Sequence, residues 1–230
     1  MNWEKMYPKS YNKNKVSPYT KVRVILMNGT EYESTWFLHN FARHCNIDEI
    51  KKAIAIVRRQ EQQQQKRISC LKPINESPLE TAISYEQLAI DLTAILAINE
   101  KDANNKKALD FALLEDFDHL YRFANLLKMD KKIDSEKLVG KYTEIMPGRP
   151  TISEFRYPSD DLRTPMNAKK ADVYTKLVAG IITAAEQQTM NYYMNISSFY
   201  KNHLGRRLFA EIGIIEEQHV THYEKCRSCI

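Results

Sequence analysis

Six acidic and histidine residues recur at matched intervals inside the most apolar parts of this chain. They are Glu86, Asp116, His119, Glu186, Glu216 and His219. The first precedes the second by 30 residues, and the fourth precedes the fifth by the same 30 residues. Ionisable side chains are costly to bury unless they are paired or bind a metal. This set therefore restricts the fold more than any other feature of the sequence.

The segments that carry these residues have the apolar periodicity of α-helices. We predict helices over about 78–98, 106–129, 169–200 and 206–226, with Ser77 as the N-cap of the first. Short polar turns, "NEKDANN" and "KNHLG", join the first pair and the second pair. Residues 140–168, with four prolines and two glycines, separate the pairs. The pattern predicts an all-α four-helix bundle with one long crossover over residues 76–226.

The spacing predicts that the six side chains meet at mid-bundle. The midpoints of the two 30-residue intervals, positions 101 and 201, fall inside the two turns. In an antiparallel helical pair, residues equidistant from the turn lie at the same height, and residues three apart share a face. Four carboxylates would then meet two imidazoles. Two divalent metal ions would neutralise the carboxylates, and mixed oxygen and nitrogen ligands suit iron or manganese.

Residues 76–226 resemble the ferritin-like superfamily, which includes rubrerythrin, bacterioferritin and manganese catalase. The six residues above and the 140–168 crossover carry the resemblance, and "LLEDFDHLYRF", "AAEQQTMNYYMN" and "IIEEQHVTHYE" are similar to an uncharacterised bacterial group within it. The resemblance implies two iron ions, or alternatively two manganese ions or a mixed pair. Asp116 departs from the glutamate usual in the family. Either Asp116 binds one metal without bridging, or Glu115 takes its place beside His119.

By resemblance, such a centre reacts with peroxide or dioxygen, as a peroxidase, an oxidase or a catalase does. The alternative is a non-catalytic bundle with a structural metal or none, acting as a binding or regulatory module. Tyr193 and Tyr223 each lie seven residues after a proposed carboxylate ligand and hence on the same helix face. Each could donate a hydrogen bond or an electron there, or simply pack in the core with its hydroxyl satisfied.

Residues 1–75 are expected to form a separate extension of a basic arm, a hairpin and a helix. Six of the basic residues and one acid fall within residues 1–23, but no nucleic-acid recognition motif accompanies them. Asn28-Gly29 between two β-prone runs indicates a β-hairpin. The pattern from about Thr35 to Ile68 indicates a helix that ends in the Gln-rich run "RRQEQQQQKR".

The remaining signals concern the C-terminus, location and assembly. Cys226-x-x-Cys229 is either a redox pair, half of a zinc site or part of a frayed tail, residues 227–230. The sequence shows no signal peptide, and its most apolar run is interrupted by Asp91. We therefore expect a cytoplasmic protein without a membrane or nucleic-acid partner, assembled as a homo-oligomer, most simply a dimer.

Overall fold

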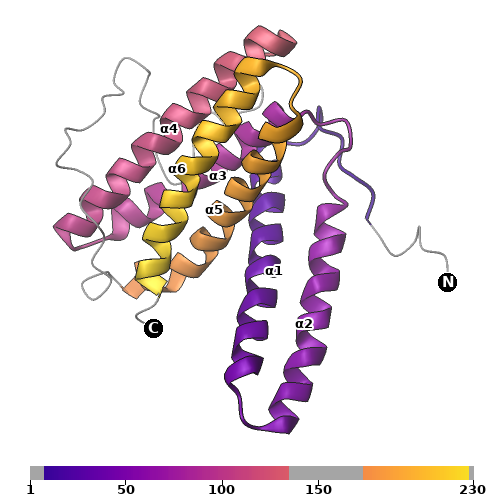
Figure 1. The fold of residues 1–230 in the computed structure, drawn as a ribbon, viewed down its shortest axis with the longest axis vertical. Helices are drawn as coiled ribbons and strands as arrows, with labels where there is room; N and C mark the ends of the chain where they lie inside the picture. The colour runs from indigo at the N-terminus through magenta and orange to yellow at the C-terminus, as the bar shows by residue number, and fades with distance from the viewer. Residues whose placement is uncertain (1–7, 135–172, 228–230) are drawn as a thin grey trace. The chain divides into compact units, whose positions relative to one another are not determined.

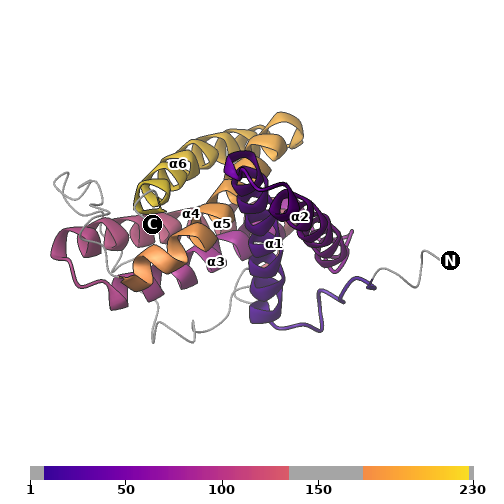
Figure 2. The same ribbon diagram turned by 90° about the horizontal axis from the view of Figure 1, so that it is seen from below.

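A computed structural model describes residues 8–134 and 173–227 of the chain. Within these ranges the chain forms α-helices and no strand, which confirms the all-α prediction (Figure 1, Figure 2). The chain divides into two compact units, Met1–Glu76 and Ser77–Ile230.

The first unit contains an antiparallel helical hairpin of α1 (Pro18–His44) and α2 (Asp48–Ser69). Ser17 caps α1, because its hydroxyl accepts a hydrogen bond from the Thr20 amide. The first turn of α2 carries two acidic residues, which favour a helix start through the helix dipole. The Gln-rich run lies in α2, as predicted. The predicted helix from Thr35 to Ile68 is therefore two helices, with a break at Cys45–Ile47.

The predicted β-hairpin at Asn28-Gly29 is wrong, because both residues lie inside α1. Hydrogen bonds between α1 and α2 explain the outcome. The Ser69 hydroxyl donates to Asn28 Oδ1 over 3.0 Å, and Arg58 lies 2.7 Å from His39 Nδ1. An isolated two-stranded hairpin is only marginally stable in water, whereas α1 gains packing against α2 along its length.

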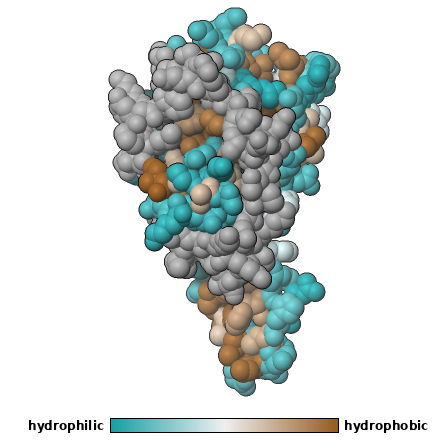
Figure 3. All heavy atoms as spheres, turned by 90° about the vertical axis from the view of Figure 1, so that its left-hand side faces the viewer, coloured by the Kyte–Doolittle hydropathy of each residue, from teal (hydrophilic) through white to brown (hydrophobic). Residues whose placement is uncertain are grey.

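The α1–α2 hairpin leaves several large apolar side chains on its surface. Figure 3 shows some of them in brown at the bottom of the view, where the turn between the helices lies. The exposed fractions are 50% for Trp36, 55% for Phe37 and 54% for Ile47. The apolar residues that the hairpin does bury, such as Val22 and Ile54, make a small core.

The second unit is a bundle of four helices, arranged as two helical hairpins. The helices are α3 (Pro78–Asn99), α4 (Ala103–Lys131), α5 (Val173–Phe199) and α6 (His203–Arg227). Ser77 begins α3 with a capping box in which Ser77 and Glu80 each bond the other's backbone amide, so the predicted N-cap is confirmed. Asp102 caps α4 by accepting from two backbone amides.

Contacts between the two hairpins show how the helices run. The Tyr200 hydroxyl donates to Asp130 over 2.8 Å, and the Phe123 and Tyr193 rings lie 5.0 Å apart. The two residues of each pair are separated by 70 positions in the sequence, so α4 and α5 run in the same direction. The end of α4 and the start of α5 therefore lie at opposite ends of the bundle. The predicted crossover at 140–168 lies outside the described residues.

Helix α3 buries most of its side chains. Within the described ranges it is the one helix long and apolar enough to cross a membrane, but 83% of that apolar window is buried inside the protein. It also carries Glu86, which is fully buried. Its apolar character is accounted for by this burial.

Candidate metal centre

All six side chains singled out in the sequence meet in the middle of the bundle. Their ligand atoms form two overlapping groups, and within each group the atoms lie within 4.8 Å of one another. One group contains Glu86 and His119, and the other contains Glu186 and His219. Asp116 and Glu216 belong to both groups. Each group could hold a metal ion, and the two groups share two carboxylates.

The cluster is sealed from solvent, and much of its hydrogen-bonding capacity is unused. Each of the six residues is at most 1% exposed. Within the cluster, six buried atoms have no hydrogen-bond partner among the described residues: Glu86 Oε2, Asp116 Oδ1, His119 Nδ1 and Nε2, Glu186 Oε2, and Glu216 Oε1. Buried polar atoms are normally satisfied, so a concentration of unsatisfied ones requires an explanation. Atoms that are placed to bind a metal provide one.

Both histidines present Nδ1 to the carboxylates. His119 Nδ1 lies 2.9 Å from Glu216 Oε1 and 3.4 Å from Glu86 Oε2. His219 Nδ1 lies 3.2 Å from Glu216 Oε2 and 3.4 Å from Asp116 Oδ1. The short contact between His119 and Glu216 lacks the geometry of a hydrogen bond, because His119 Nδ1 is one of the unsatisfied atoms. Such close approaches of lone-pair atoms suit a shared cation.

The two adjacent acids on α4 have different places. Asp116 is fully buried and belongs to both groups of ligand atoms. Glu115, with a side chain 14% exposed, lies behind His219 instead, with its Oε2 3.0 Å from Nε2. Asp116 is thus the α4 carboxylate that faces the cluster. Glu115 faces the outer nitrogen of a histidine on another helix.

Hydroxyl groups on neighbouring helices hold two of the carboxylates. The Tyr193 hydroxyl, on α5, donates a hydrogen bond to Glu86 Oε1 on α3. The Thr93 hydroxyl donates to Asp116 Oδ2 over 3.3 Å and lies 3.2 Å from the Tyr223 hydroxyl. Both tyrosines therefore lie on the helix face of the ligands, as their spacing predicted; Tyr193 bonds a cluster carboxylate, and Tyr223 contacts Thr93. The sequence does not single out Thr93, because a threonine carries no charge and its hydroxyl bonds a residue on a different helix.

Burial disfavours charge on three of the four carboxylates. It raises the pKa of Glu86 to about 7, and the Glu216 carboxylate adds to this effect. Burial also raises the pKa of Asp116 well above its ordinary value, although the imidazole of His219 opposes the rise. The pKa of Glu186 is raised well above its ordinary value by burial and then by Glu216 and Asp116.

The fourth carboxylate and the two imidazoles favour charge. Burial alone would raise the pKa of Glu216, but His119 and His219 outweigh it and hold that pKa below its ordinary value. Burial opposes a charged His119, yet Glu86 and Glu216 together raise its pKa to about 10. Glu115 and Glu216 likewise raise the pKa of His219 well above its ordinary value, against the effect of burial. Without a metal, the cluster therefore holds protons.

The other candidate in the sequence cannot be placed. The side chains of Cys226 and Cys229 lie outside the described residues. Within the described ranges, the groups of histidine, cysteine, aspartate and glutamate that could hold a metal ion are the two above. Comparisons of the chain with protein-family models, curated proteins and solved structures found no match.

Proposed function

We propose that the bundle of α3–α6 binds two iron or manganese ions and uses them to react with peroxide or dioxygen. One ion would be held by Glu86 and His119, and the other by Glu186 and His219. Asp116 and Glu216 would lie between the two ions. The observation that carries the proposal is the pair of overlapping ligand groups, each sealed in the core.

Charge and donor chemistry fit two divalent ions of this kind. Four ionised carboxylates carry a charge of −4, which two divalent ions balance, whereas the neutral imidazoles complete the ligand shells. The unsatisfied atoms include one from each of the four carboxylates. Four carboxylates with two Glu/Asp-x-x-His pairs on facing helices form the ligand set of di-iron and di-manganese bundles, which supports a ferritin-like assignment.

The proposed reactants follow from the chemistry of the metals and from burial. Iron and manganese ions supply electrons through a change of oxidation state. Because the six side chains are at most 1% exposed, only a small oxidant fits beside them without movement of the core. The hydroxyl of Tyr193 holds Glu86 in place, and Thr93 holds Asp116. These residues would keep the ligand atoms oriented during the reaction.

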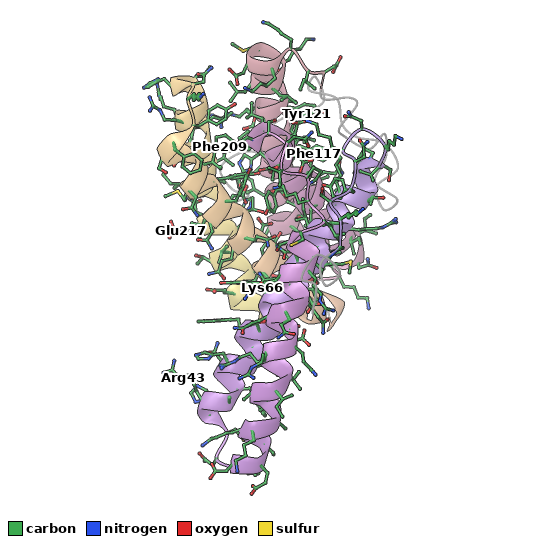
Figure 4. All side chains as sticks on the ribbon, turned by 90° about the vertical axis from the view of Figure 1, so that its right-hand side faces the viewer. Arg43, Lys66, Phe117, Tyr121, Phe209 and Glu217 are labelled. Atoms are coloured by element: carbon green, nitrogen blue, oxygen red, sulfur yellow. The ribbon has the colours of Figure 1, made fainter. Side chains whose placement is uncertain are left out.

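Elemental analysis of protein purified without chelator or affinity metal tests metal binding. We expect about two iron or manganese ions per chain. The double variant Glu86→Gln/Glu216→Gln keeps the side-chain volumes and should lose the metal while its circular dichroism stays helical. Glu217→Gln is the matched control, because Glu217 is exposed and points away from the bundle in Figure 4. Metal-free native protein, even after anaerobic reconstitution with either ion, would refute the proposal.

Oxidant consumption separates a redox enzyme from a structural metal site. Loaded native protein and the Glu217→Gln control should consume hydrogen peroxide or dioxygen, and the double variant should not. A non-catalytic bundle would instead bind two metals, consume neither oxidant, and lose thermal stability when the metals are removed. That result would favour the alternative of a binding or regulatory module.

A further inference from the structure

We infer that the two metal positions are unequal, and that the position of Glu186 and His219 binds its ion more tightly than the position of Glu86 and His119. The inference rests on the proposed metal centre. It depends on the side chains that hydrogen-bond to the ligands from behind, which differ between the two helical hairpins.

The inner ligands of the two positions are closely equivalent. Glu86, Asp116 and His119 correspond to residues exactly 100 positions later in the second hairpin, and both histidines present Nδ1 to the carboxylates. Each position has one glutamate and one imidazole of its own, and both share the same two intermediate carboxylates. A difference in affinity must therefore come from groups behind the ligands.

The first difference lies behind the histidines. His219 Nε2 lies 3.0 Å from the carboxylate of Glu115. His119 Nε2 has no hydrogen-bond partner among the described residues, although it is buried. The position 100 residues after Glu115 is Ile215, whose side chain has no acceptor. The second hairpin therefore lacks the carboxylate that the first hairpin supplies.

A carboxylate behind a metal-binding histidine strengthens metal binding in two ways. It accepts a hydrogen bond from Nε2–H, which fixes the tautomer that leaves the Nδ1 lone pair free for the metal. It also increases the electron density on the ring. Loss of such a partner typically lowers metal affinity about 10–100-fold. His219 has this support from Glu115, whereas His119 does not.

The second difference lies behind the glutamates and acts in the same direction. Glu86 Oε1 accepts a hydrogen bond from Tyr193, so one of its oxygens is already engaged and its charge is partly withdrawn. The residue 100 positions before Tyr193 is Thr93, which donates to the shared Asp116 instead. The position of Glu86 and His119 thus has a histidine with no carboxylate behind it and a glutamate that is bonded to a tyrosine hydroxyl.

Anaerobic titration of metal-free protein with cobalt(II) tests this inference, because visible cobalt bands report on each nitrogen–oxygen site as it fills. We expect two binding steps of different affinity in the native protein and in the Glu217→Gln control. Glu115→Gln should weaken the tighter step about 10–100-fold and leave the weaker one unchanged. His219→Ala should abolish the tighter step, and His119→Ala the weaker one.

The possible contrary results have different meanings. A native chain that takes up no cobalt would overturn the proposed metal centre and this inference with it. Two cobalt ions bound with equal affinity, or a tighter step that survives in Glu115→Gln or His219→Ala, would overturn this inference alone. Circular dichroism of each variant shows that the helices are intact, so an altered binding step is assigned to the site.

Discussion

Replacement of Glu86 by glutamine should make the metal-free protein less sensitive to rising pH. Glutamine keeps the volume of the side chain and an oxygen that can accept from Tyr193, but it cannot ionise. In the native chain, burial and the nearby Glu216 carboxylate raise the pKa of Glu86 to about 7 from its ordinary value of 4.5. The folded state therefore binds this proton more tightly than the unfolded state does.

The sign and size of the effect follow from proton linkage. Stability from the raised pKa of Glu86 is fully present below pH 4.5 and is lost as the pH rises through about 7. The shift corresponds to about 3 kcal/mol of unfolding free energy between pH 4.5 and pH 8. Glu86 also helps to raise the pKa of His119, whose Nδ1 lies 3.4 Å from Glu86 Oε2, so the replacement removes part of that pH-dependent stability too, in the same direction.

Urea unfolding of chelator-treated protein, followed by circular dichroism from pH 4.5 to pH 8, measures this difference. With a dependence of about 1–3 kcal/mol per molar urea, the midpoint of Glu86→Gln should rise by about 1–3 M relative to the native chain across this range. Glu217→Gln should follow the native chain, because its carboxylate is exposed. If Glu86→Gln and the native chain lose stability in parallel, the carboxylate is not held in a desolvated cluster.

Three further predictions concern proton release, capping and packing. Metal loading near neutral pH should release several protons, because Asp116 and Glu186 have raised pKa values and the imidazoles must lose a proton to bind metal. Calorimetry in buffers of different ionisation enthalpy counts the released protons. Metal uptake that does not depend on pH would contradict this expectation. Ser77→Ala should destabilise the bundle by about 1 kcal/mol in urea unfolding, and Ser77→Thr should restore most of this loss. Gly205→Ala should lower the melting temperature more than Gly213→Ala does. The new Cβ at position 205 would lie 2.5 Å from the Tyr200 ring, whereas the Cβ at position 213 would meet the movable Met194 sulfur at 3.0 Å. Equal changes in melting temperature would argue against the packing of Tyr200.

The place of the six residues could be predicted because helix periodicity is a local property. A residue's height in an antiparallel hairpin follows from its distance to the turn, and the two intervals of 30 residues therefore place all six at one level. The choice between Glu115 and Asp116 could not be made in this way. Adjacent helical residues point about 100° apart, and the rotation of α4 that selects one of them depends on packing against the other helices.

The N-terminal unit shows where local signals fail. Asn28-Gly29 is a strong turn signal, but it specifies a hairpin only if the flanking runs find strands to pair with. In this chain α2 instead offers Ser69 to Asn28 and a surface along which α1 packs. The break at Cys45–Ile47 was equally hidden, because no proline or glycine marks it. The basic Arg43 and His44 before it and the acidic Asp48 after it were the available signals.

The packing around the cluster explains how the fold tolerates a centre that disfavours folding on its own. On one side, the rings of Phe123, Tyr193 and Phe209 lie with centroids 4.9–5.6 Å apart. On the other side, Leu96, Leu109, Ile182 and Tyr223 form an apolar cluster. These two layers fix the four helices above and below the carboxylates, so the ligand atoms are held close together by apolar packing. Because these apolar contacts do not involve the ligand atoms, we expect the helical content to survive metal removal. The stability gained on loading should grow with pH as the carboxylates lose their protons.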